Sequence, residues 1–188
     1  MTGTMKLRIA LAAIFLPTAL SLGACAGTPL GTDKIALATP GKANRVKQSF
    51  HLEYAVSTPI KASPEKIWAV LTDAPAYTSW NSTITSLKGK IAPGETLELK
   101  AKIAPAQTFE PEVSHFEAPR RMVWESGSFI FHGRRVFTLK PAGDGTTIFL
   151  MVEHFKGLML PMIAGSLPDF RAPFETFAAD LKKRCERE

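Results

Sequence analysis

The spacing of apolar and polar side chains along the chain predicts a run of antiparallel β-strands. The clearest alternation lies in residues 97–103, where Leu97, Leu99 and Ala101 alternate with polar residues. A period of two is typical of a half-buried strand. The same reasoning predicts further strands at residues 50–60, 109–114, 121–126, 131–139 and 146–155. Strands that follow one another at such short intervals favour an antiparallel meander with one covered face.

A short amphipathic helix is predicted after the first of these strands. Ser63 is a good N-cap, Pro64 suits the first helical position, and Glu65 places a negative charge at the helix N-terminus. Apolar residues then recur at positions i, i+3 and i+4 until about Asp73, and Pro75 ends the helix.

A long helix is predicted at the C-terminus. Its apolar stripe consists of Phe170, Phe174, Phe177 and Leu181. A curved antiparallel sheet wrapped around this helix is the simplest way to bury such a stripe, so the chain is assigned to the α+β class. A chain of 188 residues is long enough for one domain with a core of its own.

Four short motifs resemble the SRPBCC superfamily, the START-like helix-grip proteins of the polyketide cyclase/dehydrase and lipid-transport type. They are Ala62–Trp68, Tyr77–Asn81, Pro141–Gly145 and Glu153–Gly157. The resemblance extends from about Val56 to Arg184. It implies a helix-grip fold, in which a curved antiparallel β-sheet wraps around a long C-terminal α-helix and two short helices follow the first strand. It also implies an apolar cavity between sheet and helix. These motifs are structural, so they specify the fold well and the chemistry poorly.

The N-terminus resembles the signal peptide of a bacterial lipoprotein. Lys6 and Arg8 precede an apolar segment at residues 9–22, which is too short for a membrane span of about 20 residues. The sequence LGAC at Leu22–Cys25 resembles a lipobox, whose cysteine becomes the lipidated N-terminus. An ordinary cleaved signal, with an incidental cysteine at this position, is the alternative.

This interpretation divides the chain into a signal peptide (1–24), a lipid-attachment cysteine with a flexible tether (25–49) and an SRPBCC domain (50–188). The tether is inferred from glycine, proline and threonine without apolar periodicity. A lipidated Cys25 leaves Cys185 unpaired, whereas a disulfide between the two is the alternative if Cys25 is not lipidated. The protein is therefore expected in the bacterial cell envelope as an extracytoplasmic, membrane-anchored lipoprotein.

The distribution of charge argues against a nucleic-acid partner. The net charge is +6, but the basic residues are scattered and no aromatic residues are interleaved with them. The expected extracytoplasmic location also argues against a nucleic-acid partner. We expect a monomer whose partners are a hydrophobic small molecule or lipid and, through the N-terminal anchor, a membrane.

No catalytic or metal-binding motif is evident. His51, His115, His132 and His154 lack the spacing of metal ligands, and His132 and His154 are expected on the solvated face of the sheet. There is no nucleophile elbow and no glycine-rich phosphate loop. The sequence therefore predicts neither a metal nor a cofactor.

Glu153 is the acidic residue most closely associated with the predicted cavity. It alternates with Phe149 and Met151 and so is expected to point inward. A carboxylate in apolar surroundings has a raised pKa and could act as a general base. The favoured alternative is a salt bridge to Arg135 on the neighbouring strand, or a position at the rim. Arg135 could equally hold the carboxylate or headgroup of an amphipathic ligand.

Aromatic side chains predominate among the residues expected to line the cavity, although each could equally belong to the core. The expected ligand-binding residues are Trp80, Phe109, Trp124, Phe131, Arg135, Phe137, Phe149, Met151, Glu153 and Phe174. An apolar wall with few polar groups favours binding or carriage of a hydrophobic or amphipathic, lipid-like molecule. The alternatives are a polyketide cyclase/dehydrase-like enzyme acting in the same cavity and an envelope interaction protein.

Overall fold

The computed structural model describes residues 39–187, and the structural statements below concern this part of the chain. The predicted signal peptide (1–24) and Cys25 lie outside it. The elements in chain order are β1 (Ala43–Gln48), β2 (His51–Ile60), α1 (Pro64–Thr72), the 3-10 helix η1 (Ala74–Ala76), α2 (Tyr77–Trp80), β3 (Ile84–Lys88), β4 (Glu98–Ala101), β5 (Glu112–Glu117), β6 (Arg121–Gly127), β7 (His132–Gly143), β8 (Thr146–Lys156), α3 (Leu160–Ile163) and α4 (Arg171–Cys185). No helix between residues 39 and 187 combines the length and the apolar character needed to cross a membrane.

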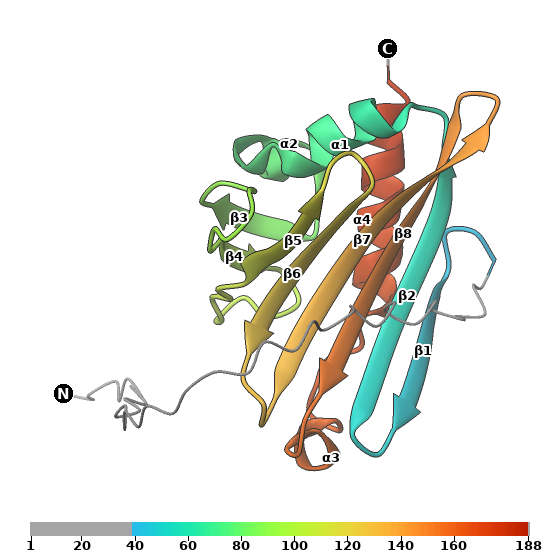
Figure 1. Cartoon of the computed structure of the whole chain (residues 1–188). Coiled ribbons are helices and arrows are strands. Elements are labelled where there is room, and N and C mark those ends of the chain that lie inside the picture. Colours follow the sequence, from blue (N-terminus) through green and yellow to red (C-terminus); the bar gives the residue numbers. More distant parts are fainter. Residues whose placement is uncertain (1–38, 188) are drawn as a thin grey trace, which may run out of the picture. The chain divides into compact units, whose positions relative to one another are not determined.

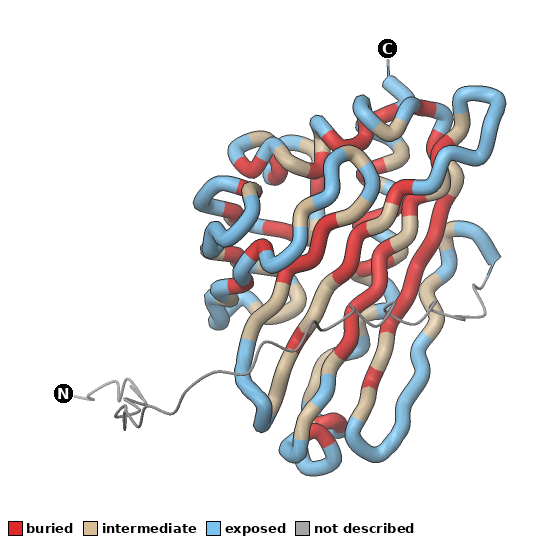
Figure 2. Tube along the Cα trace, in the orientation of Figure 1, coloured by how far each residue is buried: buried red, intermediate tan, exposed pale blue. Residues whose placement is uncertain are grey.

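Six strands form one antiparallel sheet in the order β1-β2-β8-β7-β6-β5, and α4 lies along one face of it (Figure 1). The short helices α1 and α2 follow β2, as the resemblance implies. Buried residues run along the central strands of the sheet (Figure 2). The predicted α+β helix-grip fold is confirmed.

The structure corrects the predicted tether. Residues 43–48 form β1, which pairs with β2 along its whole length. The strand is also attached to α4, because the carboxylate of Glu175 accepts a hydrogen bond from the backbone N–H of Ala43 (3.0 Å) and pairs with Lys42 (3.2 Å). The side chains of residues 45–48 are all exposed. An edge strand without a buried face has no apolar alternation, so the sequence pattern does not predict β1.

The strands that were predicted to form one meander belong to two separate sheets. The strand expected at residues 97–103 is the shorter β4, which pairs with β3 in a separate two-stranded sheet. The strand expected at residues 109–114 begins only at Glu112, and Phe109 makes an isolated bridge to Leu99. Pro111 has no backbone N–H, which interrupts regular pairing before β5.

The motif Tyr77–Asn81 shapes the turn from α1 into β3. The hydroxyl of Tyr77 donates to the carbonyl of Leu71 at the end of α1 (2.9 Å), and burial raises the pKa of this hydroxyl despite the opposing charge of Arg135. The side-chain oxygen of Asn81 accepts hydrogen bonds from the backbone N–H groups of Thr83 (2.9 Å) and Ile84 (3.3 Å). These bonds hold the first residues of β3 against the helices.

Phe177 is the centre of the packing between α4 and the sheet. Its ring centroid lies 5.6 Å from that of Trp80, and 6.1 and 6.2 Å from those of Phe137 and Phe149. The predicted stripe on α4 is confirmed for Phe174, Phe177 and Leu181, which are all buried. Phe170 is instead the N-cap residue of α4 and is only partly buried. Phe177 therefore connects α4 to the sheet through aromatic contacts.

Candidate functional site

A cavity of about 980 Å³ lies on the N-terminal side of Phe177, between α4 and the sheet. Its wall is formed by α4, by β6, β7 and β8, by residues 82–84 and 99–111, and by the segment 163–170 that leads into α4. Most of these residues are apolar, whereas exposed polar side chains border the cavity at Lys102, Gln107 and Ser166. An apolar interior with a polar rim is typical of a site for a small organic ligand.

Small residues in the wall contribute to this space. Gly133 on β7 has ordinary backbone geometry, and a Cβ atom added to it would meet its nearest neighbours at normal contact distances. These neighbours are the ring of Phe155 and the hydroxyl of Ser126, both at 3.6 Å, and the carboxylate of Glu153 at 3.7 Å. A larger side chain at residue 133 would therefore occupy space inside the cavity.

Most of the residues predicted to bind ligand line this cavity, but three of them do not. Those in the wall are Phe109, Trp124, Phe131, Arg135, Met151, Glu153 and Phe174. Trp80, Phe137 and Phe149 instead pack around Phe177 in the closed part of the molecule. Pattern alone could not separate the two groups, because core and cavity wall share one face of the sheet.

Arg135 and Glu153 form an ion pair inside the cavity wall. They face each other on β7 and β8, and the Nε–H group of Arg135 donates to a carboxylate oxygen of Glu153. The side chain of Glu153 is 8 % exposed and that of Arg135 is 18 % exposed. The guanidinium of Arg135 also lies 5.3 Å from the ring centroid of Phe174 on α4. The favoured prediction of a salt bridge is confirmed, and Glu153 is a paired carboxylate.

Trp124 lies in the cavity wall and carries a buried hydrogen-bond donor. The residue is 2 % exposed, and its indole N–H has no acceptor among residues 39–187. A buried donor without a partner costs about 1–3 kcal/mol. The nitrogen atom is itself inaccessible to solvent, so this N–H group does not face the open space of the cavity.

The segment between β8 and α4 supplies part of the rim. Asp169 accepts hydrogen bonds from the backbone N–H (3.0 Å) and Nε–H (2.9 Å) of Arg171, and these bonds lower the pKa of its carboxyl to about 2. Sequence reasoning did not select this segment or residues 82–84. Pro161, Gly165 and Pro168 disfavour a strand between β8 and α4. They could have indicated that an irregular segment, and not the sheet, forms this part of the wall.

One prediction about the histidines is wrong. His154 does lie on the face of the sheet opposite Phe149 and Met151, but it is only 8 % exposed. It forms an ion pair with Glu53 (3.1 Å), which also pairs with His51 (3.3 Å). These residues come from two strands that are far apart in the sequence, so their proximity could not be deduced from spacing. The thiol of Cys185 is buried and has no disulfide partner among residues 39–187, and burial raises its pKa to about 11.

Comparison with known proteins gives one family match. Residues 51–187 match the family model described as "Polyketide cyclase / dehydrase and lipid transport". A sequence comparison with curated proteins finds no match.

Several solved structures have the same fold. A START superfamily protein from Mycobacterium smegmatis is 21 % identical, with a TM-score of 0.53 over 71 % of this chain and 97 % of that chain. Norcoclaurine synthase from Thalictrum flavum, in complex with dopamine and hydroxybenzaldehyde, is 10 % identical, with a TM-score of 0.58 over 74 % of this chain and 91 % of the enzyme. The hypothetical protein jhp0584 from Helicobacter pylori is 13 % identical, with a TM-score of 0.59 over 83 % and 99 % of the two chains.

Proposed function

The chain belongs to the polyketide cyclase/dehydrase and lipid transport family, and we propose that it binds and carries an amphipathic, lipid-like molecule in the cavity beside α4. The observation that supports this proposal is the cavity itself. A volume of about 980 Å³ with a mainly apolar wall is at the upper end of the range that small-molecule sites occupy.

The polar groups in the wall favour carriage over catalysis. An enzyme needs an acid or base that is free to exchange a proton with its substrate. The inward carboxylate, Glu153, is engaged by Arg135. A carrier needs only an apolar space with a few groups that orient the ligand.

Arg135 suggests the kind of ligand. It lines the cavity, and its guanidinium carries further N–H donors besides the Nε–H group that donates to Glu153. A ligand with an apolar body and an oxygen-rich end, such as a carboxylate or ester, would pair with this guanidinium.

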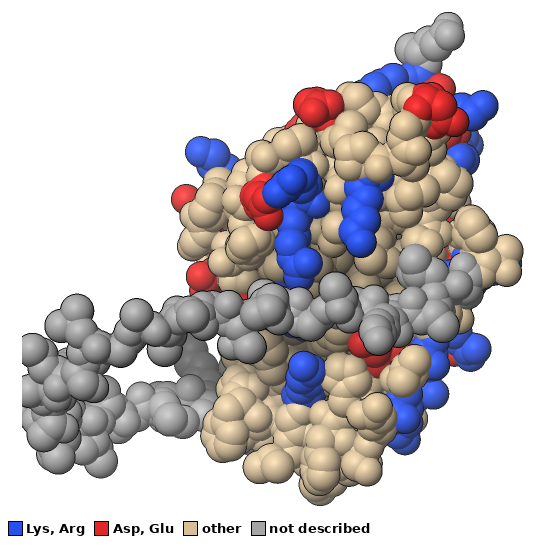
Figure 3. Space-filling view, turned by 45° about the vertical axis from the view of Figure 1, so that its right-hand side comes forward, with Lys and Arg blue, Asp and Glu red and all other residues tan. Residues whose placement is uncertain are grey.

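A group of exposed apolar side chains next to the cavity supports exchange of this ligand with a membrane. We call it the apolar end, and it consists of Phe50, Phe129, Leu158 and Met162, which are 56–81 % exposed. The backbone joins these loops, since Met159 N–H donates to Ile130 (3.2 Å) and Gly157 N–H donates to Phe50 (3.4 Å). In Figure 3, few charged side chains are visible at the lower end of the molecule, where α3 lies. Exposed apolar clusters of this kind often contact membranes or partners.

The envelope location is part of the proposal and rests on the sequence at Leu22–Cys25. Replacing Cys25 with serine removes the thiol that would carry the lipid. The variant is expected in the soluble extracytoplasmic fraction and the wild type in the membrane fraction. If a labelled fatty acid fails to mark the wild-type protein, the lipid anchor is excluded.

Substitutions at Gly133 test the binding proposal. The probe is cis-parinaric acid, a fluorescent fatty acid, titrated into the purified protein. Gly133→Leu places an isobutyl group in the cavity and is expected to weaken binding at least tenfold. Gly133→Ala is the matched control, because its added methyl group fits at 3.6–3.7 Å from its neighbours, and it should bind within a few-fold of wild type. Equal binding by wild type and Gly133→Leu would contradict the proposal.

The enzyme alternative is supported by the fold it shares with norcoclaurine synthase and by the presence of a carboxylate in the cavity. It requires Glu153 to leave Arg135 when substrate binds. Substitutions of this ion pair therefore separate the two functions.

A further inference from the structure

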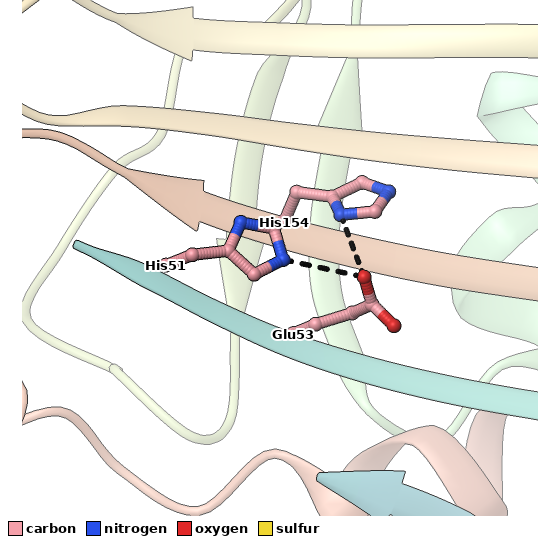
Figure 4. Close-up of side chains that lie close together, drawn as sticks. All are labelled: His51, Glu53 and His154. Atoms are coloured by element: carbon pink, nitrogen blue, oxygen red, sulfur yellow. Dashed lines mark hydrogen bonds and ion pairs between the residues drawn. The ribbon is translucent and has the colours of Figure 1, made fainter. Parts of the chain in front are cut away.

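Three potential metal ligands converge on the face of the sheet that is opposite the cavity. Glu53 on β2 lies directly across from His154 on β8, and His51 is two residues before Glu53 on the same face of β2. Figure 4 shows both imidazole rings directed toward the carboxylate of Glu53. Nε2 of His51 and Nδ1 of His154 lie 3.3 and 3.1 Å from the same oxygen, Oε2.

The spacing of these atoms is close to that of a tetrahedral metal site. The three ligand atoms all lie within 4.8 Å of one another. Around an ion with bonds of about 2.0–2.1 Å, tetrahedral ligands lie roughly 3.4 Å apart. The two contacts with Glu53 already match this separation, so only the two imidazole rings need to approach each other.

The residue types indicate which ion fits. The two imidazole nitrogens are borderline ligands that suit Zn²⁺ and similar transition ions, which also accept a carboxylate oxygen, whereas Mg²⁺ and Ca²⁺ prefer oxygen ligands throughout. The site is also protected, because the side chains of His51, Glu53 and His154 are only 24 %, 14 % and 10 % exposed. We propose that His51, Glu53 and His154 form a binding site for a divalent transition-metal ion of the Zn²⁺ type.

The charged neighbours are compatible with a cation. Arg134 is opposite His154 on β7, but it is paired with Glu125 (2.8 Å). Lys156 is opposite His51 and is exposed, so its ammonium group can extend into solvent. With both imidazoles neutral, the cluster carries the single negative charge of Glu53, to which the ion adds two positive charges.

The site and the cavity lie on opposite faces of the sheet. His154 and Glu153 are neighbours on β8, so their side chains point to opposite faces, and Glu153 lines the cavity. An ion at His154 would therefore have no contact with a molecule in the cavity. It would instead join β2 to β8, two strands separated by about 90 residues of sequence, and so stabilise the sheet. A ligand that binds only the folded state raises its stability in proportion to its affinity.

The experiment is a Zn²⁺ titration of the full chain, prepared without an affinity tag, by competition with a fluorescent chelator. The wild type is expected to bind one Zn²⁺ per chain, and His51→Ala and His154→Ala are expected to weaken binding at least tenfold each. His115→Ala is the matched control, since this exposed histidine lies on β5 outside the cluster, and its affinity should equal that of wild type. Both cysteines remain in every variant, so loss of binding cannot be attributed to thiols.

Glu53→Gln provides a second variant that preserves side-chain shape if an alanine variant fails to fold. With Co²⁺ in place of Zn²⁺, the wild type should show the visible absorption of a tetrahedral site, and Glu53→Gln should lose it. Zn²⁺ should raise the Tm of wild type and leave that of Glu53→Gln unchanged, while cis-parinaric acid affinity is the same with and without Zn²⁺. Equal Zn²⁺ affinity in wild type and all variants, or no binding at 100 µM, would show that the cluster is an ion-paired network only.

Discussion

At the residue scale, the ion pair between Arg135 and Glu153 distinguishes a carrier from an enzyme. Replacing Glu153 with glutamine leaves a guanidinium at the cavity wall without its carboxylate. Loss of one partner of a buried ion pair costs on the order of 3 kcal/mol. We therefore expect Glu153→Gln to lower the free energy of unfolding measured by urea denaturation, while cis-parinaric acid affinity stays within a few-fold of wild type.

The double variant Arg135→Met, Glu153→Leu is the control for this prediction. It removes both charges and should recover most of the lost stability, because apolar replacement of a buried pair is often neutral. An enzyme would respond in the opposite way. Glu153→Gln would then keep its stability and its ligand affinity but lose turnover about 100-fold or more.

At the element scale, the position of α4 depends on Phe177. Phe177→Ala removes a ring that is 2 % exposed and contacts Trp80, Phe137 and Phe149. Removal of a buried aromatic ring costs about 3–5 kcal/mol, which urea denaturation can measure. Phe129→Ala is the control, because this ring is 81 % exposed and should change stability little. A loss well below 1 kcal/mol for Phe177→Ala would mean that α4 does not close the core.

The attachment of β1 to α4 should depend on pH. The pKa of Glu175 is lowered, first by the hydrogen bond from Ala43 N–H and also by Lys42, from an ordinary value of 4.5. A lowered pKa means that the ionised carboxylate stabilises the folded state above pH 4.5, and that this contribution is lost as the pH falls through the folded-state pKa. The difference in Tm between wild type and Glu175→Gln should be largest at pH 7 and shrink below about pH 4.5. A difference that is independent of pH would contradict this account.

The main elements could be predicted from the sequence because each has a strong local signal. Ser63 does accept a hydrogen bond from the backbone N–H of Lys66 (3.3 Å), as its N-cap role requires, and most of the stripe on α4 is buried as predicted. The edge strand β1 has no buried face to produce a pattern. The strand β4 was misplaced in the main sheet because alternation identifies a strand but not its partner, and its true partner β3 was not predicted.

At the scale of the whole molecule, the lining of the cavity could be predicted only in part. Inward residues on β7 and β8 follow from the period of two, which correctly brought Arg135, Met151 and Glu153 together. The point along α4 at which the core ends and the cavity begins depends on how Phe177 packs against the sheet, which is a tertiary property. Phe137 and Phe149 were therefore assigned to the cavity but belong to the core. The pairing of His154 with Glu53 depends on β2 and β8 being neighbours in the sheet. This strand order is also a tertiary property, and the sequence motifs do not specify it.

Exchange of ligand with a membrane is a property of the whole molecule that involves the apolar end. Phe129 and Met162 are each 81 % exposed and do not line the cavity. The double variant Phe129→Ser, Met162→Ser should retain its affinity for cis-parinaric acid in solution. It should transfer a fluorescent fatty acid between phospholipid vesicles at least fivefold more slowly than wild type. Val46→Ser, at an exposed residue of β1, is the control. Unchanged transfer by the double variant would exclude this end as the membrane contact.

The central claim is that the cavity beside α4 holds an amphipathic molecule, and native mass spectrometry of the protein purified from its own cells tests it most directly. The wild type should carry one bound molecule per chain, which is released on denaturation and can be identified as an oxygen-containing, largely apolar compound. Gly133→Ala should carry the same molecule, and Gly133→Leu should carry little or none. An empty wild-type protein that also fails to take up amphipathic lipids offered in excess, or equal loading of wild type and Gly133→Leu, would contradict the account.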